Sequence, residues 1–334
     1  MKAIIIDRPI RTNRTSMNSD YSGIYTNVLN TPLVVRSIKN LKAHGITQIY
    51  VATEQAPPPE LSNGDPWGVQ LTYLSDLTLS NLDYAEENVL LLPGNVILEL
   101  DYSKFERWHI TAKSAVSRAT PFRAGGSLPA QYFPPTLLST EMVHRAFIEK
   151  NKISVLALLN LCNRYHDNHH GVQLVESVGG LVSNQEYWRA HQSIMKAGLP
   201  SESVQGFPLG DNLWVDLNTR VDKSVRVDGF AIIGKNSKIN KNVTFKGFVV
   251  IGDDVTIDQD VIIEDSIVRN NSYIGANVHV KNAIVTQDKL YRADYDTILN
   301  IEESWLLGAN KVSRSNKWFH KSANDQGMWG IAGQ

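Results

Sequence analysis

The sequence predicts a doubly wound α/β domain followed by a parallel β-helix. Two observations support this prediction. Over residues 1 to about 198, short apolar segments alternate with helix-like segments, an order typical of a largely parallel sheet covered by helices. From residue 215 onward, apolar residues instead recur every six positions, a spacing that fits neither a helix nor a flat strand.

The first elements are a strand, a helix and a second strand. Residues 3–6 form a short apolar run that predicts a buried strand. Thr31 is expected to cap a helix with Pro32 at its first position, and Gly45 is expected to end it. Residues 46–53, ITQIYVAT, predict the next strand.

The alternation continues along the first domain. Residues 87–101, ENVLLLPGNVILELD, predict a strand, a turn at the Pro-Gly pair and a second strand. Residues 139–165 predict one helix, and residues 184–197 predict another that Gly198 closes. The first domain is therefore predicted over residues 1–198.

Two apolar tracks with a period of six run through residues 215–285. Larger residues make up the first track, and small or β-branched residues follow four positions later on the second. The first track holds Val215, Val221, Val227, Ile233, Ile239, Phe245, Ile251, Ile257 and Ile263, and resumes as Val268, Ile274 and Val280. After the same one-residue slip, near residue 265, the second track continues as Ser272, Val278 and Ile284.

Hexapeptide repeats indicate a left-handed parallel β-helix, in which each hexad forms a short strand and a corner. If three hexads make one turn, this region gives about four coils. Residues 199–212 are interpreted as a linker, residues 213–289 as the β-helix, and residues 290–334 as a tail that packs on it.

Composition narrows the class of function. The chain has 334 residues and a net charge of −1, which argues against nucleic acid as a partner. Its single cysteine, Cys162, excludes an internal disulfide and suits a reducing compartment. We find no apolar stretch of membrane-spanning length, and the start MKAIII is interpreted as a strand, so a cytoplasmic protein without a membrane partner is expected.

The quoted segments resemble a known family. LNTPLVVRSIKNLKAHGITQIYVAT and ENVLLLPGNVILELD, followed by hexapeptide repeats, resemble the sugar-1-phosphate nucleotidyltransferases, particularly the mannose-1-phosphate guanylyltransferase type. The resemblance implies a Rossmann-like nucleotidyltransferase domain. It also implies Mg²⁺-dependent transfer of a nucleotide to a sugar-1-phosphate, with release of pyrophosphate.

The resemblance fails at the residues that it implies for catalysis. Asp7 and Arg8 stand where the family has a glycine-rich signature that approaches the phosphates. The family's phosphate-binding lysine falls near Gly23. Asn95 and Gly180 stand at the positions of its two metal-binding aspartates. Since the loss of one such contact commonly lowers a rate by about 10² to 10³, the chain is expected to be catalytically degenerate.

A degenerate relative is expected to bind a nucleotide sugar or nucleoside triphosphate, without a cofactor, and to regulate or scaffold an active paralogue. Arg8, Arg11 and Arg14 are candidates to hold a phosphate, with Asp7 and Asn95 in the same degenerate pocket. We also expect a homo-oligomer formed through the β-helix. The alternative is an active enzyme that needs Mg²⁺, with Asp7 as a substitute metal ligand.

Other features suggest further hypotheses. Hexapeptide-repeat acyltransferases use a histidine base between coils, and His279 is the histidine in the repeats, although a surface position is its simpler interpretation. The run HDNHH, residues 166–170, is either a transition-metal site or a polar loop. Cys162 is interpreted as a small buried side chain on a helix.

The tail combines aromatic and basic residues. Trp305, Trp318 and Trp329 either pack over the open end of the β-helix or, with the neighbouring lysines and arginine, bind a partner.

Overall fold

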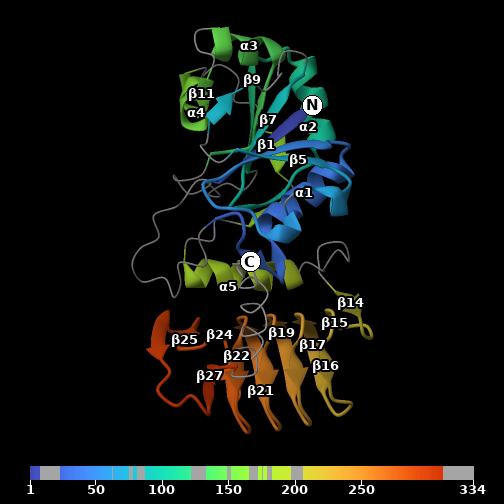
Figure 1. Ribbon diagram of the computed structural model, residues 1–334, viewed down its shortest axis with the longest axis vertical. Helices are drawn as coiled ribbons and strands as arrows, with labels where there is room; N and C mark the ends of the chain where they lie inside the picture. Colours follow the sequence, from blue (N-terminus) through green and yellow to red (C-terminus); the bar gives the residue numbers. More distant parts are fainter. Residues whose placement is uncertain are drawn as a thin grey trace, which may run out of the picture. The chain divides into compact units, whose positions relative to one another are not determined.

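The computed structural model describes residues 1–7, 23–61, 63–74, 78–80, 87–121, 133–148, 152–164, 172–174, 176–178, 183–196 and 206–310. The chain divides into two compact units, Met1–Ala190 and His191–Gln334 (Figure 1). The predicted linker stays a prediction, because residues 197–205 lie outside the described residues.

A seven-stranded sheet forms the centre of the first unit, in the order β12-β9-β10-β7-β1-β4-β5. Its strands are β1 (Lys2–Ile6), β4 (Gln48–Ala52), β5 (Gln70–Leu74), β7 (Val89–Pro93), β9 (Val116–Pro121), β10 (Thr136–Leu138) and β12 (Val172–Leu174). All neighbours pair in parallel except β10, which is antiparallel to β7 and β9. The prediction of a largely parallel α/β sheet is therefore confirmed.

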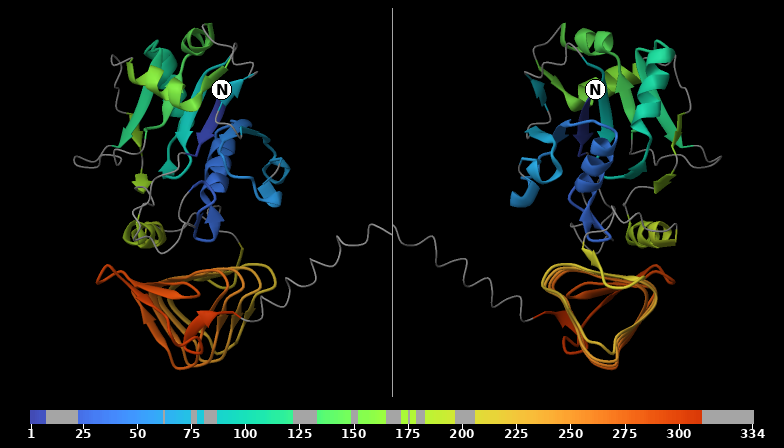
Figure 2. Two further views of the ribbon diagram at one scale, coloured as in Figure 1. Left: turned by 60° about the vertical axis from the view of Figure 1, so that its left-hand side comes forward. Right: turned by 90° about the vertical axis from the view of Figure 1, so that its right-hand side faces the viewer.

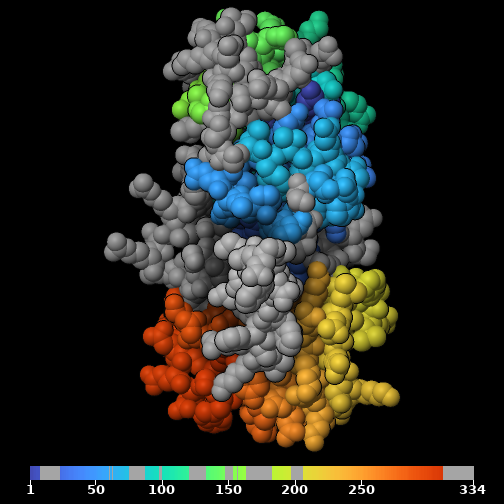
Figure 3. Space-filling model, in the orientation of Figure 1, coloured from blue at the N-terminus to red at the C-terminus, as the bar shows by residue number. Residues whose placement is uncertain are grey.

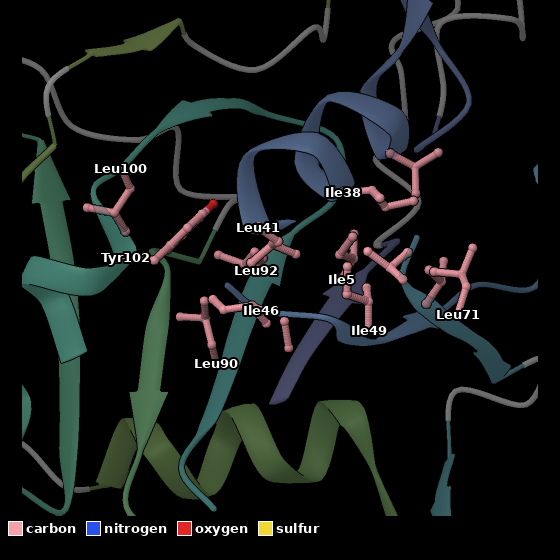
Figure 4. Close-up of a cluster of buried hydrophobic side chains, with 14 of the residues drawn as sticks. Ile5, Ile38, Leu41, Ile46, Ile49, Leu71, Leu90, Leu92, Leu100 and Tyr102 are labelled. Carbon is pink, nitrogen blue, oxygen red and sulfur yellow. The ribbon is translucent and has the colours of Figure 1, made fainter. Parts of the chain in front are cut away.

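Helices cover both faces of this sheet. Alternate residues of β1 point to opposite faces, as in any strand. Ile5 lies in one apolar cluster with Ile38 of α1 (Leu33–Ala43) and Tyr102 of α2 (Tyr102–Thr111) (Figure 4). Ile4 lies in another cluster with Met142 of α3 (Thr140–Ile148) and Leu158 of α4 (Val155–Arg164).

The start of α1 differs from the prediction. Pro32 occupies the N-cap position, and Thr31 makes no cap because it pairs in β3 (Thr31–Pro32) with β2 (Asn27–Val28). The two residues between these strands both have positive φ, which closes a tight hairpin and commits Thr31 to it. Gly45 ends the helix as predicted, with a φ of 79° and its amide 2.8 Å from Lys42 O.

Residues 139–165 do not form one helix, so that prediction is wrong. Between α3 and α4 lies β11 (Lys152–Ser154), which pairs antiparallel with β6 (Thr78–Ser80) and buries Ile153. Ser154 Oγ then accepts a hydrogen bond of 3.1 Å from the Ala157 amide and caps α4. Pairing with a distant strand has overridden the helical spacing.

The remaining predicted elements of this unit are present. β7 is followed by a turn and by β8 (Ile97–Glu99), which pairs with β13 (Glu176–Val178). α5 spans Asn184–Lys196, and short 3₁₀ turns occur at Pro59–Leu61 and Asp65–Trp67. Among the helices that the structure describes, none has the length and apolar character to cross a membrane.

The second unit contains the predicted parallel β-helix. One of its sides consists of β15 (Leu213–Val215) and parts of β17 (Arg226–Ile233), β19 (Thr244–Ile251), β21 (Ile262–Val268) and β24 (Ala283–Val285). A second side consists of β16 (Arg220–Val221), β18 (Lys238–Ile239), β20 (Thr256–Ile257) and β22 (Ser272–Ile274). A third uses the first residues of β17, β19 and β21 with β23 (His279–Lys281). Seen end-on, the coils form a triangle (Figure 2).

The strand register confirms both the coil length and the slip. Lys246 pairs with Glu264, an offset of 18 residues or three hexads, whereas Val249 pairs with Ser266, an offset of 17 residues. The one-residue irregularity therefore lies at Asp265, where the sequence placed it.

A change of corner explains the slip. In the earlier coils a Gly-Phe pair makes this corner, and in the next coil Asp265 makes it alone, with a φ of 45°. Asp265 Oδ1 accepts a hydrogen bond of 3.2 Å from the Phe248 amide of the coil before. Asn282, with a φ of 48°, makes a second shortened corner. Because of this corner, Ala283 rather than Ile284 joins the core, so the second track was predicted wrongly at Ile284.

Antiparallel strands end the stack of coils. β25 (Lys289–Arg292) pairs with β24, and β26 (Thr297–Asn300) pairs with β25. β27 (Leu307–Ala309) pairs antiparallel with β22 and buries Leu307 in the core. Trp305 is 67% exposed. Contrary to the packing hypothesis, its side chain therefore does not pack over the open end of the β-helix. Trp318 and Trp329 lie outside the described residues.

The surface of this unit follows the coil order, from yellow at β14 (Phe207–Pro208) to red at β25 and β26 (Figure 3). In the first unit Cys162 is 1% exposed within the α3 and α4 cluster, which confirms its interpretation as a buried side chain.

Candidate ligand-binding site

The order of the strands gives a topological switch point beside β1. From β1 the chain continues to β4 and β5 on one side and then crosses to β7 on the other. In such sheets, ligands bind outside the carboxyl ends of the strands where the direction of winding changes. Asp7 directly follows β1, Thr53 follows β4, and Asn95 follows β7 after one residue. The structure therefore brings the predicted residues Asp7 and Asn95 to the same edge.

A close approach of the backbone fixes the β7 end of this edge. The Gly94 amide donates a hydrogen bond of 2.8 Å to Ile6 O of β1. A Cβ at Gly94 would lie 2.2 Å from Ile24 Cγ2, so only glycine fits there. Asn95, which is 6% exposed, is consequently held beside the end of β1.

Asp7 is a buried carboxylate bound to the neighbouring strand. It is 4% exposed, and its Oδ2 accepts a hydrogen bond of 2.9 Å from Thr53 Oγ1. Thr53 Oγ1 in turn accepts from the Gln55 amide at 3.1 Å. Burial raises the pKa of Asp7, and the hydrogen bonds from Thr53 and the Ile24 backbone partly oppose this rise.

Gly23 passes directly over this carboxylate. Its φ is 106°, a conformation that L side chains rarely adopt. A Cβ at this position would lie 2.9 Å from Gln55 Nε2 and 3.3 Å from Asp7 Oδ2. A side chain at the position where the resemblance expects a phosphate-binding lysine would therefore be strained by its φ and would have to displace the end of Gln55.

Two tyrosines complete the described part of the site. Tyr73 Oη donates a hydrogen bond of 2.6 Å to Leu61 O, and burial raises the pKa of Tyr73 to about 12. Burial also raises the pKa of Tyr25, and the nearby Tyr73 and Asp7 raise it further. Both phenols therefore keep their protons at neutral pH.

The residues do not fit a divalent cation held by two carboxylates. An amide, Asn95, and a glycine, Gly180, stand at the two positions that the resemblance gives to aspartates. One oxygen of Asp7 is already bound by Thr53. Within the described ranges, His, Cys, Asp and Glu side chains do not gather in threes around a point suited to a metal ion.

Sequence reasoning missed part of this site. It did not select Thr53, Gln55, Tyr25 or Tyr73, although Thr53 immediately follows a predicted parallel strand and could have been found by that rule. The predicted residues Arg8, Arg11 and Arg14, and the run HDNHH, lie outside the described residues.

His279 lies on the surface of the β-helix, as its simpler interpretation predicted. Its side chain is 51% exposed, and Nε2 lies 3.5 Å from Glu264 Oε2. Lys281 Nζ lies 2.9 Å from the other oxygen of the same carboxylate. The imidazole is thus part of a surface charge cluster.

A family model matches the β-helix. Residues 209–316 match the family model described as the GMPPB C-terminal domain, of the mannose-1-phosphate guanylyltransferase family. The match covers β15 to β27, and the α/β unit lies outside it.

Solved structures also match the chain. One is a protein from Bacillus anthracis described as a glucose-1-phosphate thymidylyltransferase, solved at 2.76 Å in complex with sucrose. Its TM-score is 0.38 with 12% sequence identity, and the alignment covers 57% of this chain and 93% of that chain. Among curated proteins, none matches the sequence.

Proposed function

We propose that the chain is a catalytically degenerate nucleotidyltransferase relative that binds a nucleotide sugar and regulates or scaffolds the synthesis of such compounds. The position of Gly23 carries this proposal. In the α/β unit the backbone of Gly23 lies close to Asp7 and Gln55. Catalysis would need a cationic side chain against the phosphates at this position. A compensating lysine cannot enter there without moving Gln55.

The charge of the site supports the same proposal. Phosphoryl chemistry depends on cations that neutralise charge on the phosphates. Here the end of β1 carries the carboxylate of Asp7, and the turn after β7 carries the neutral amide of Asn95. The switch point at the end of β1 nevertheless remains, and we infer that binding is retained while the groups for transfer are replaced.

Partners belong to this proposal. The ligand is a nucleotide sugar or nucleoside triphosphate, and the regulated protein is an active paralogue of this chain. The β-helix is the surface for assembly into a homo-oligomer, since its coils present flat sides.

Two measurements on the full chain test the proposed function. Thermal unfolding is followed with GDP-mannose, UDP-glucose, GTP and UTP, and pyrophosphate release is measured with GTP, mannose-1-phosphate and Mg²⁺. An active mannose-1-phosphate guanylyltransferase serves as the positive control. We expect a nucleotide sugar to raise Tm, with pyrophosphate release at least about 10³-fold below the control.

Two results would contradict the proposal. Release at the rate of the control would show an active Mg²⁺-dependent enzyme, and no shift of Tm with any nucleotide would leave only a scaffold. An acyl-CoA added to the same panel covers the acyltransferase hypothesis, which predicts a shift of Tm that depends on His279.

A further inference from the structure

Two buried polar atoms at the end of β1 have no hydrogen-bond partner among the described residues. They are Asp7 Oδ1 and Tyr25 Oη. Such atoms are rare in native structures because each loses its interaction with water without a replacement. The other two atoms of this kind in the described chain, on Ser114 and Ser272, are isolated hydroxyls. Only at the candidate site do an acceptor and a phenol occur together.

Neighbouring residues define the surroundings of both atoms. Thr53 holds the opposite oxygen of the Asp7 carboxylate, which fixes the direction of Oδ1. A Cβ at Gly23 would lie 3.4 Å from Oδ1, and glycine brings no side-chain donor to this oxygen. Tyr25 is near enough for Asp7 and Tyr73 to raise its pKa, and Tyr73 Oη already donates its own proton to Leu61 O.

The carboxylate disfavours a phosphate at this point. Two unit charges of the same sign about 4 Å apart, at the effective dielectric of a protein surface, weaken binding by on the order of 10³-fold. An uncharged group that donates a hydrogen bond meets no such repulsion and satisfies Oδ1. The phenol of Tyr25 can donate to a neighbouring oxygen of the same ligand.

We propose that Asp7 and Tyr25 form a subsite for an uncharged ligand group that carries an O–H or N–H donor beside an acceptor, and that this subsite excludes phosphate. This inference rests on the proposed function and specifies which part of a nucleotide sugar lies at the end of β1. Sugar hydroxyls and the ring amide of a nucleobase share the required chemistry. The phosphates of the ligand lie away from Asp7.

Binding to matched variants of the full chain tests the subsite. Tyr25→Phe removes the unpartnered hydroxyl, whereas the control Tyr291→Phe, in β25 of the β-helix, removes a hydroxyl that already donates to Asp296 Oδ1. Asp7→Asn removes the charge and offers a donor or an acceptor. Dissociation constants for GDP-mannose, guanosine, mannose and inorganic phosphate are measured by calorimetry, with circular dichroism to confirm folding.

We expect Tyr25→Phe to weaken GDP-mannose binding by about 5- to 30-fold and Tyr291→Phe to change it less than about 2-fold. Asp7→Asn weakens binding of the donor ligand and strengthens binding of inorganic phosphate, so the ratio of the two constants changes by at least about 10-fold. If only guanosine binding is weakened in the variants, the nucleobase occupies the subsite. If only mannose binding is weakened, the sugar occupies it.

The outcomes separate this inference from the proposed function. Equal binding of GDP-mannose to the wild type, Tyr25→Phe and Asp7→Asn would overturn the subsite and leave the proposed function standing. Binding of guanosine or mannose that Tyr25→Phe abolishes, without binding of GDP-mannose, would keep the subsite and overturn the proposed function. If the wild type binds none of GDP-mannose, guanosine and mannose, both the subsite and the proposed function are wrong.

Discussion

Thr53 Oγ1 donates a hydrogen bond of 2.9 Å to Asp7 Oδ2, across 46 residues of sequence. The bond joins the ends of two adjacent parallel strands, because β1 and β4 pair with Ile6 opposite Ala52. A buried carboxylate without such a donor is costly. Thr53 therefore determines both the orientation of Asp7 and part of its electrostatic environment.

Replacement of Thr53 tests this relationship. Thr53→Val leaves Asp7 Oδ2 and the Gln55 amide without their partner, so we expect the free energy of unfolding to fall by about 2 kcal/mol. Thr53→Ser retains the hydroxyl and is expected to lose less than about 1 kcal/mol. Denaturant unfolding at pH 7 measures both. Equal losses would show that the methyl group, rather than the hydrogen bond, stabilises the site.

The pH dependence of the same pair gives a second prediction. Because burial raises the pKa of Asp7 in the folded chain, folding favours its protonated form. The cost of the charged carboxylate is therefore present at neutral pH and disappears as pH falls through the pKa. The deficit of Thr53→Val relative to Thr53→Ser should shrink in that direction, and a deficit that grows on acidification would contradict the assignment.

His109 predicts a loss of stability in acid. It is 2% exposed on α2, with Nδ1 2.7 Å from Ser117 Oγ, and burial lowers its pKa to about 4 from an ordinary value of 6.5. Between these values the unfolded chain binds a proton that the folded chain does not, so stability falls as pH falls. At pH 4.5 the loss is about 2 to 3 kcal/mol relative to pH 7.

His109→Gln removes this titration. The variant is expected to start less stable at pH 7, through poorer packing, and to lose less than the wild type between pH 7 and pH 4.5. Urea unfolding at both pH values measures the loss of stability of each protein between pH 7 and pH 4.5, and the two losses are then compared. Parallel losses in the two proteins would mean that His109 does not titrate as its burial implies.

The Gly-Phe corners of the β-helix predict an asymmetry between two glycines. A Cβ at Gly229, where φ is 130°, would lie 2.1 Å from Gly247 O of the next coil. Gly229→Ala is expected to cost at least about 3 kcal/mol, because the backbone of two coils must separate. Gly210 has a φ of 93° but nothing within 4 Å of its Cβ position, so Gly210→Ala should cost about 1 kcal/mol. Similar thermal shifts for the two variants would refute the steric explanation.

The shortened corner at Asp265 makes a chemical prediction. An isolated left-handed residue with a side-chain acceptor suits Asp or Asn, and Asn282 already serves at the next such corner. Asp265→Asn should change the free energy of unfolding by less than about 0.5 kcal/mol, whereas Asp265→Ala should lower it by about 1 to 2 kcal/mol. Equal stability of the two variants in denaturant would show that the Phe248 amide does not need this acceptor.

Cys162 should be unreactive in the folded protein. Burial raises its pKa to about 11, and only the thiolate attacks disulfide reagents. At pH 8 the folded chain should react at least about 10²-fold more slowly than the urea-unfolded chain. Comparable rates would place the thiol at the surface, and Cys162→Ala gives the background of the assay.

Periodicity explains which parts of the fold could be predicted. Val249, Ile251 and their equivalents repeat because each coil of a β-helix presents the same positions to one core, so the sequence alone determines the coil length and even the slip at Asp265. The alternation of strands and helices in the first unit can likewise be predicted from residues that are close together in the sequence. A run such as residues 139–165 misleads because β11 is stabilised by pairing with β6, far away in the sequence.

The sequence by itself determined the two folds and the repeat, because these properties depend on residue identity and spacing along the chain. Only the tertiary structure decided the composition of the site. Thr53 meets Asp7 because parallel pairing brings strand ends together from separate parts of the chain, and Gly23 lies close to Asp7 and Gln55. Residue spacing carries no record of such contacts, since the crossover connections that create them differ in length and direction.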